Sequence, residues 1–312
     1  MITLARTAEE AVAATGEFRA GGTDVQERRR SGIARGALVD IHLLTGYDRI
    51  DWRADGAATI GALVTIDAIA SDPRIRAAYP GLALAAGGLA TPQIRQVGTL
   101  GGSLLQRTRC WYFRHPAFNC YKRGGDTCPA RTGQHQHGVI FDLGPCVFPH
   151  PSTLGMALLA YEAEIEVHGQ GWRPAEALFG DGSDPHRDHL LEPGELLTQA
   201  ALPAPLAGER AAYFRAITRA EAEWPLVEAL ARLALDDHGT ISFARIGVGG
   251  VANVPLRLPQ VEAALLGQPA TAETLERAAA RATEGVTSLP LTGYKVPLLR
   301  GVVLEALERA LG

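Results

Sequence analysis

The sequence predicts an α+β fold arranged as two domains. A chain of 312 residues is long enough to form two substantial hydrophobic cores. Strand-like runs and helix-like runs both occur, yet they do not follow one another as regular βαβ units. Hydrophobic residues at 46% and charged residues at 21% are ordinary for a soluble globular protein. We therefore expect strands and helices grouped in two units rather than one alternating α/β sheet.

Short helices, strands and glycine turns are expected before residue 106. Thr65 can cap a helix that follows a β-branched run, and glycine ends a run of small residues at 82–90. In chain order, the expected elements are a helix at 7–15, a Gly-rich turn at 21–23, a polar helix, a strand at 37–41, a strand at 59–66 running into a helix, a helix at 82–90 and a Gly-rich turn at 98–103.

The pattern changes between residues 106 and 149, where periodicity disappears and Cys, Gly, Arg, His and Pro become frequent. A loop of this length without regular structure is usually functional or disordered, and its four cysteines favour a functional loop. Order resumes beyond it. The expected elements are a helix at 153–160, a strand at 162–169, a loop at 180–189, strands at 196–202 and 211–219, a helix at 225–235, a strand at 241–251 and helices at 271–283 and 297–311.

Charge and hydropathy exclude several classes of protein. The net charge of −4 gives no general reason to expect nucleic-acid binding. No apolar stretch approaches the roughly 20 residues of a membrane span. The first residues lack the charged start, apolar run and cleavage site of a signal peptide. By its own sequence the chain is expected in the cytoplasm; the alternative is export to the periplasm with a partner that carries a signal.

Two glycine-rich turns are candidates for binding phosphate, RAGGTD at 19–24 and GTLGGS at 98–103. Glycine permits backbone conformations in which successive N–H groups point into one concavity, which suits a phosphate or pyrophosphate. The hydroxyl groups of Thr23, Thr99 and Ser103 could add donors. Neither turn matches the GxGxxG fingerprint or the P-loop, so a simple tight turn remains the alternative for each.

All four cysteines, Cys110, Cys120, Cys128 and Cys146, lie in the 106–149 loop. Four thiolates can bind a zinc ion or a 4Fe–4S cluster. The spacing of 9, 7 and 17 intervening residues lacks the close pairs typical of structural zinc, which favours the bulkier cluster and leaves zinc open. A disulfide framework is not expected in one loop of a large soluble chain.

Other residues of this loop fit an anionic centre. Basic residues and glycines would place positive charge and N–H donors around a cluster, which raises its reduction potential: Arg107, Arg109, Lys122, Arg123, Gly124 and Gly125. A histidine ligand in place of a cysteine is the alternative, at His135, His137 or, near the loop ends, His115 and His150. We interpret these histidines, like His186 and His189, as solvated.

Four segments together resemble one known family. They are AGGTD at 20–24, IGALVTI at 60–66, QIRQVGTLGGSL at 93–104 and HPST at 150–153, followed by a similar chain ending, YKVPLLRGVVLEAL from Tyr294. The chain resembles the FAD-binding (medium) subunit of the xanthine oxidase, or molybdenum hydroxylase, family along nearly its whole length. Within it, LLQRTRC at 104–110 and the first cysteine spacing are most similar to the 4Fe–4S-containing flavoprotein subunit of periplasmic aldehyde oxidoreductase.

The resemblance implies a fold, cofactors and partners. It implies an FAD-binding domain of the vanillyl-alcohol-oxidase (PCMH) type at 1–175, with an iron–sulfur insertion at about 106–149, and a smaller α+β domain at 176–312. Electrons would pass from a large molybdopterin-binding subunit, through 2Fe–2S clusters on a small subunit, to FAD on this chain and then to an external acceptor. No residue here would act on the organic substrate. The implied FAD-binding residues are Arg19, Ala20, Gly21, Gly22, Thr23, Asp24, Val25, Gly98, Thr99, Gly101, Gly102, Ser103 and Thr153, and the implied cluster ligands are the four cysteines.

The sequence departs from the family pattern at three positions. Gln96 stands where many relatives have Asn, Ser103 varies between Ser and Asn, and Thr153 replaces an Asp that lies near the flavin in the HPSD form. The last departure bears on the geometry or potential of the bound FAD. Two alternatives stay open: a 4-hydroxybenzoyl-CoA reductase-like beta subunit, in which electrons flow in reverse, and a non-redox zinc-stabilised nucleotide-binding protein.

Overall fold

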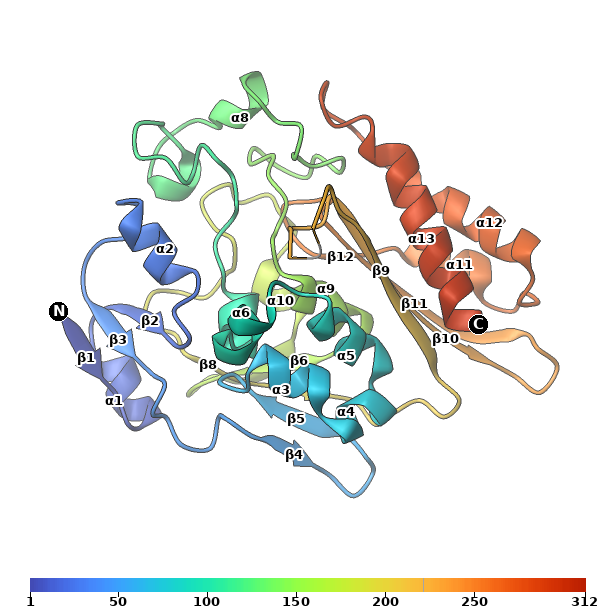
Figure 1. Cartoon of the computed structure of the whole chain (residues 1–312), viewed down its shortest axis with the longest axis horizontal. Coiled ribbons are helices and arrows are strands. Elements are labelled where there is room, and N and C mark those ends of the chain that lie inside the picture. Colours follow the sequence, from blue (N-terminus) through green and yellow to red (C-terminus); the bar gives the residue numbers. More distant parts are fainter. Residues whose placement is uncertain (221) are drawn as a thin grey trace.

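The computed structural model describes residues 1–220 and 222–312 and confirms the α+β prediction. Its N-terminal part is a small parallel sheet of order β1-β3-β2 at one end of the molecule (Figure 1). Helix α1 begins at Ala8 because Thr7 accepts a hydrogen bond from the Glu10 N–H group. The elements of this part are β1 (Ile2–Leu4), α1 (Ala8–Ala13), β2 (Glu17–Arg19), α2 (Val25–Arg30) and β3 (Leu38–Asp40).

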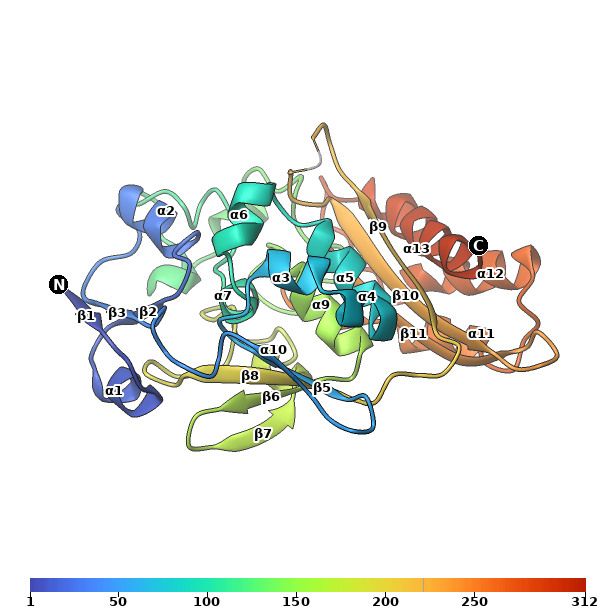
Figure 2. The ribbon, with the colours of Figure 1, turned by 60° about the horizontal axis from the view of Figure 1, so that its bottom comes forward.

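A five-stranded antiparallel sheet of order β4-β5-β8-β6-β7 forms the base of the next part. Short helices lie over one side of this sheet (Figure 2). The strands are β4 (Ile50–Trp52), β5 (Ala58–Gly61), β6 (Glu164–Val167), β7 (Gly171–Pro174) and β8 (Leu197–Leu202). The helices are α3 (Ile66–Ser71), α4 (Pro73–Ala78), α5 (Pro80–Gly87), α6 (Pro92–Val97), α7 (Leu100–Leu104), α9 (Thr153–Ala160) and α10 (Glu176–Phe179).

The C-terminal part is a four-stranded antiparallel sheet of order β12-β11-β10-β9. Helices α5 and α9 contact one face, and α11 and α13 contact the other, so this sheet is the middle layer of three (Figure 2). Its elements are β9 (Arg210–Ala216), β10 (Val227–Leu235), β11 (Ile241–Gly249), β12 (Leu256–Arg257), α11 (Pro259–Leu265), α12 (Ala272–Ala280), the 3₁₀ turn η2 (Arg281–Thr283) and α13 (Lys295–Leu311).

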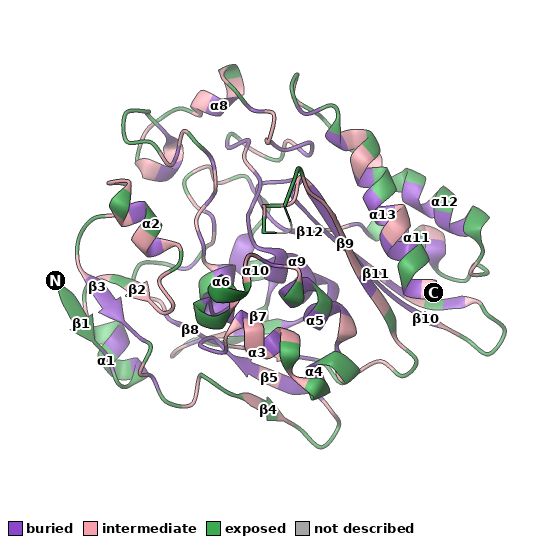
Figure 3. Ribbon diagram, viewed as in Figure 1, coloured by how far each residue is buried: buried purple, intermediate pink, exposed green. Residues whose placement is uncertain are grey.

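The helix predicted at 225–235 is wrong, because this segment forms the central strand β10. Its alanines, leucines and glutamate are good helix formers, and the local pattern favoured a helix on that ground. Eight of its nine residues are buried, between helices on both faces and a strand on each side (Figure 3). Packing against those neighbours therefore overrides the intrinsic preference of the residues.

The sheets change between β8 and β9 rather than after residue 175. Strand β8 pairs with β5 and β6, so residues 197–202 belong to the same sheet as the preceding strands. The buried cores follow this division. One core gathers side chains of α3, α5, α9 and the five-stranded sheet, including Tyr79 and Tyr161, and another lies between β9–β11 and the C-terminal helices.

The 106–149 loop holds only two short helical pieces, η1 (Tyr121–Arg123) and α8 (Pro129–Thr132). It is nevertheless attached to the C-terminal part by backbone hydrogen bonds: the N–H groups of Ile140 and Phe141 donate to the Val251 carbonyl at 2.9 and 3.0 Å, and Thr287 N–H donates to Ile140. We call residues 106–149 the cysteine loop. No helix in the described part of the chain is long and apolar enough to cross a bilayer.

Candidate FAD site and cysteine loop

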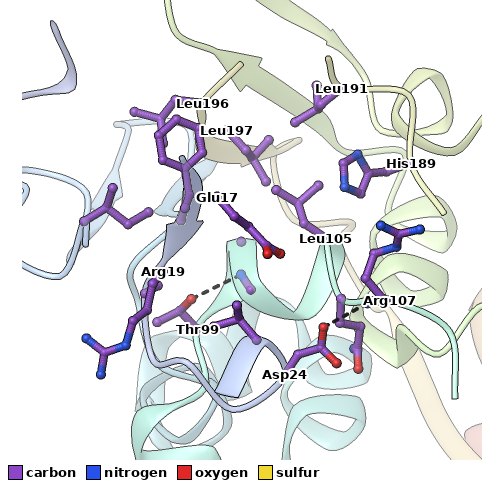
Figure 4. A pocket seen from close by; sticks show the side chains of 18 of the residues that line it. Glu17, Arg19, Asp24, Thr99, Leu105, Arg107, His189, Leu191, Leu196 and Leu197 are labelled. Atoms are coloured by element: carbon purple, nitrogen blue, oxygen red, sulfur yellow. Dashed lines mark hydrogen bonds between the residues drawn. The ribbon is translucent and has the colours of Figure 1, made fainter. Parts of the chain in front are cut away.

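A cavity of about 630 Å³ lies where the turn after β2, helix α7 and the segment 186–197 meet. Three leucines, Leu191, Leu196 and Leu197, face Thr99 and Asp24 across it (Figure 4). The cavity therefore has an apolar wall opposite a polar floor. An elongated ligand with both apolar and anionic parts is the kind of occupant that such a shape accepts.

The first glycine turn supplies free backbone donors. The N–H groups of Gly21, Gly22 and Thr23 donate no hydrogen bond to any protein atom in the described chain, although all three residues line the cavity. Gly22 has φ +73°, a conformation that glycine adopts without strain. A Cβ on Gly21 would lie 1.8 Å from the Val97 carbonyl oxygen, so the turn packs directly on the end of α6. Local geometry and packing thus both require glycine here.

The second glycine turn behaves differently, because from Leu100 on it is the short helix α7, in which the N–H groups of both glycines are already used. Gly101 donates to the Ala62 carbonyl at 2.9 Å, and Gly102 donates to the side chain of Thr99 at 3.2 Å. The expectation that Gly101 offers its N–H group to a phosphate does not match this bonding. Gly102 is exposed in the cavity and a Cβ there would meet only Thr99. Gly101 and Gly102 therefore contribute open space rather than donors.

Most residues expected at the site do line the cavity. These are Arg19, Ala20, Gly21, Gly22, Thr23, Asp24, Val25, Gly98, Thr99, Gly101 and Gly102. Ser103 and Thr153 are not among the lining residues. Ser103 is buried with its hydroxyl 3.5 Å from that of Ser152. Thr153 is also buried, and its hydroxyl donates to the carboxyl oxygens of Glu228 at 2.8 and 3.1 Å.

Asp24 is the centre of an arginine network at the cavity floor. Arg28, Arg109 and Arg114 each bond its carboxylate, at 2.8, 2.8 and 2.7 Å. Burial alone would raise the pKa of Asp24, but the nearby arginines outweigh burial and lower it. Arg109 and Arg114 come from the cysteine loop, so this network also ties the loop to the first glycine turn.

The wall at 186–197 was missed as a site element, since the sequence predicted a loop at 180–189 with His186 and His189 solvated, and a strand from 196. Arg107, Asp188 and His189 all line the cavity. Burial lowers the pKa of His189 to about 4, so its imidazole is neutral near pH 7. Nothing in its pattern of residues predicts the three-dimensional position of this wall. The sequence does show a cluster of Asp, His and Arg at 184–189, which indicates that this loop could have a function but not where it lies.

The cysteine loop gathers its four thiols in one small core. Cys110, Cys120 and Cys146 are buried with Phe113 and Val147, and Cys128 packs against them. Burial raises the pKa of Cys110 to about 12 and that of Cys146 to about 11. Neighbouring thiols add to this effect: Cys146 and Cys120 help to raise the pKa of Cys110, and Cys128 helps to raise the pKa of Cys120 and of Cys146.

The thiols are gathered but not closed around a single ion. Among residues 1–220 and 222–312, no group of three or more His, Cys, Asp or Glu side chains is placed to hold one metal ion. The histidines considered as alternative ligands are not placed in such a group among these residues either. His135 is buried and bonds the Ala130 carbonyl at 2.9 Å through Nδ1, while its Nε2 accepts from Leu291 N–H at 3.2 Å. The reading of His135 as solvated is therefore wrong.

A second cavity, of about 400 Å³, has Arg109 in its lining. It is lined by Trp111, Trp224 and Phe148 together with two buried ionisable groups, Glu228 and Lys295. Burial raises the pKa of Glu228, whose carboxyl also accepts from Tyr213 at 2.6 Å. Burial lowers the pKa of Lys295 to about 7, and its amine donates to the carbonyls of Gly250 and His137 at 2.9 and 3.2 Å.

His150 also borders the second cavity and is buried. Its Nδ1 accepts a hydrogen bond from Ser152 N–H at 3.2 Å, and its ring meets Phe179 edge to face at 4.9 Å. Its Nε2 has no partner in the described chain. Burial lowers the pKa of His150 to about 3, so the reading of this residue as solvated is wrong.

Comparison with known proteins identifies two sequence regions. Residues 3–205 match the FAD binding domain in molybdopterin dehydrogenase, and residues 212–308 match the CO dehydrogenase flavoprotein C-terminal domain. The chain is 33% identical over 303 residues to the aldehyde oxidoreductase FAD-binding subunit PaoB of Escherichia coli (strain K12), covering 94% of this chain and 92% of that protein. It is 26% identical over 261 residues to the nicotinate dehydrogenase FAD-subunit of Eubacterium barkeri, covering 82% of this chain and 74% of that protein.

Solved structures give the same picture. Carbon monoxide dehydrogenase from Hydrogenophaga pseudoflava superposes with a TM-score of 0.77 at 25% identity, covering 99% of this chain and 96% of that chain. Quinoline 2-oxidoreductase from Pseudomonas putida 86 superposes with a TM-score of 0.75 at 20% identity, covering 99% of this chain and 95% of that chain, and shares the fold.

Proposed function

This chain belongs to the family of FAD-binding subunits of molybdopterin dehydrogenases, and from that premise we propose that it is the electron-relay subunit of a molybdenum-dependent aldehyde oxidoreductase. FAD binding and an oxidoreductase role follow from the family. The aldehyde as substrate class is our proposal, supported by similarity to an aldehyde oxidoreductase subunit over nearly the whole chain. No side chain here is assigned to the oxidation of the substrate itself.

The single observation that carries the FAD site is the turn with three unused N–H groups on the floor of the 630 Å³ cavity. A pyrophosphate needs donors, and the arginines that line the cavity are already paired with carboxylates. Arg28 pairs with Asp24 and Glu17, and Arg107 pairs with Asp188. We assign the pyrophosphate to Gly21, Gly22 and Thr23, because backbone N–H groups in a concave turn bind anions without a free cation.

The remaining lining residues would fix the orientation of the cofactor. The leucine wall excludes water on one side, and Gly98 and Gly102 leave room on the other. When bound, FAD accepts electrons singly and releases them in pairs, which suits a relay between one-electron centres and an acceptor. The chain's own part is to position it.

We propose that the four cysteines hold a 4Fe–4S cluster rather than zinc. The four thiols share one buried core, and a cluster of four irons needs four such ligands. Their spacing along the chain lacks the close pairs that are typical of structural zinc sites. Buried Lys122 lies near Cys146 and lowers the pKa of that thiol against the larger effect of burial, so it would stabilise an anionic centre there.

We further propose three partners: a large molybdopterin-binding subunit, a small 2Fe–2S subunit and an external electron acceptor. The reason is chemical, since the proposed molybdenum-dependent oxidation needs a molybdenum centre, and no residue assigned here would hold one. The relatives from Escherichia coli and Eubacterium barkeri are FAD subunits of an aldehyde oxidoreductase and of a nicotinate dehydrogenase, and their being subunits supports this assembly.

The test is to purify the full chain anaerobically, reconstitute it and measure FAD, iron and sulfide. We expect one FAD and about four iron atoms per chain. Aldehyde-dependent dye reduction should be absent for the lone chain and present after mixing with both partner subunits. Stoichiometric zinc with little iron would defeat the cluster assignment, and aldehyde oxidation by the chain alone would defeat the relay assignment.

A further inference from the structure

A buried triad of charged side chains joins the cysteine loop to the wall of the first cavity. Lys122 lies in η1, two residues after Cys120, and its amine bonds Asp188 Oδ1 at 2.7 Å and also donates to the Arg187 carbonyl. The other oxygen of Asp188 accepts from Arg107 Nε at 2.5 Å. Arg107 also donates to the Lys122 carbonyl at 3.2 Å, so the triad closes on itself.

The charges of this triad hold one another in place. The side chains of Lys122 and Asp188 are 1% and 2% exposed. Burial alone would raise the pKa of Asp188, but Lys122 and Arg107 outweigh burial and hold it far below its ordinary value. Moving Asp188 away from Lys122 would leave a buried charge without its partner, which is strongly unfavourable. Asp188 is therefore fixed from the cysteine loop.

Asp188 in turn fixes the cavity wall. Residues 186–196 contain no helix or strand, yet together with Leu197 at the start of β8 they form the side that carries Leu191, Leu196 and Leu197. A segment without regular structure is held by the contacts of its side chains and a few backbone bonds. Asp188 is the charged residue of this segment that is buried, whereas Arg187 and Glu192 pair with each other nearer the surface.

We propose that Lys122 is a positioning residue for FAD. From the cysteine loop it anchors Asp188, and Asp188 in turn anchors the wall at 186–197. The cysteine loop thereby sets the affinity of the cavity for FAD. Lys122 itself does not line that cavity. The inference rests on the proposed FAD site and holds whichever metal centre the cysteines bind.

The test is the dissociation constant of FAD for the full chain, measured by quenching of flavin fluorescence. Lys122→Met keeps the apolar stem of the side chain and removes its charge. We expect FAD to bind at least tenfold more weakly, which corresponds to about 1.4 kcal/mol. The matched control is Arg232→Met, which breaks an equally buried pair with Glu209 (2.7 Å, side chains 5% and 4% exposed). Arg232 lines neither cavity, so this control should lose stability while its FAD affinity stays within twofold of the parent's.

A double variant, Lys122→Met with Asp188→Asn, keeps the test decisive if the single variant does not fold. It removes the buried carboxylate together with its lysine, and the charge left without a carboxylate, Arg107, has a side chain that is 26% exposed. The double variant should therefore fold and bind FAD with an affinity between those of the parent and of Lys122→Met. Parent-like FAD affinity in Lys122→Met or in the double variant overturns the proposal, as does equal weakening in the Arg232 control. A parent chain that binds no FAD overturns the proposed function, and this inference with it.

Discussion

Replacing His150 with asparagine should flatten the dependence of folding stability on pH. Asn retains an oxygen close to the position of Nδ1, which accepts from Ser152 N–H at 3.2 Å, and it cannot be protonated in this range. The imidazole is buried, and burial lowers its pKa to about 3 in the folded chain. In the unfolded chain the pKa of a histidine is about 6.5.

The sign and size follow from these two values. Below about pH 6.5 the unfolded chain binds a proton at His150 that the folded chain does not take up until about pH 3, so lowering the pH favours unfolding. Stability linked to His150 is therefore present above pH 6.5 and is lost as the pH falls. Between pH 7 and pH 5 the loss is about 2 kcal/mol, because nearly every unfolded chain and almost no folded chain becomes protonated there.

Urea unfolding at pH 7 and pH 5, on the chain without cofactors, measures this difference. The loss of stability on going from pH 7 to pH 5 should be about 2 kcal/mol smaller in His150→Asn than in the parent. His186→Asn serves as the control for replacing an imidazole, because the His186 side chain is 55% exposed and is hydrated in both states. Equal losses in the parent and in His150→Asn would refute the reasoning, since a histidine that titrates alike in both states contributes no slope.

Three further outcomes can be checked together. Gly102→Val should leave the thermal midpoint near the parent's but lower FAD content, because its side chain enters the cavity and meets only Thr99; full FAD occupancy would show that the cavity is assigned to the wrong ligand. Gly21→Ala should lower the thermal midpoint itself, because the new Cβ would lie 1.8 Å from the Val97 carbonyl oxygen; an unchanged midpoint would contradict the packing described. Thr153→Asp should lose about 3 kcal/mol in urea unfolding, because it places a second carboxylate against buried Glu228; adding Glu228→Gln should restore most of it, and no restoration would mean that the two residues are not coupled.

The glycine turn at 19–24 could be predicted from sequence because its function depends on the local backbone. Gly21 and Gly22 are required by a close contact and by a positive φ, and both requirements leave a visible glycine in the sequence. The four cysteines were recognisable for a similar reason, since they occur nowhere else in the chain. Features that depend on residue type alone can therefore be recognised in a single sequence.

The parts that could not be predicted depend on distant contacts. Strand β10 reads as a helix because its residues favour one, and its conformation is decided by β9, β11 and the helices on both faces. Asp188 lies in the cavity wall because Lys122, 66 positions away, holds it there. The hydroxyl of Thr153 donates its hydrogen bond to Glu228, which is 75 positions away. Sequence spacing carries no information about such partners when only one sequence is considered.

The backbone bonds that fasten the cysteine loop have a consequence for how the chain opens. The amide hydrogens of Ile140, Phe141 and His150 are donated to Val251 and Ala252 of the C-terminal part. They should exchange with deuterated solvent only when the loop separates from β11 and the residues after it. A stretch without helices or strands would ordinarily exchange within seconds, but these three amides should exchange as slowly as those of the neighbouring sheet. Proteases should accordingly cut at exposed turns such as the one around Gly239 before they cut at buried Ile140 and Phe141.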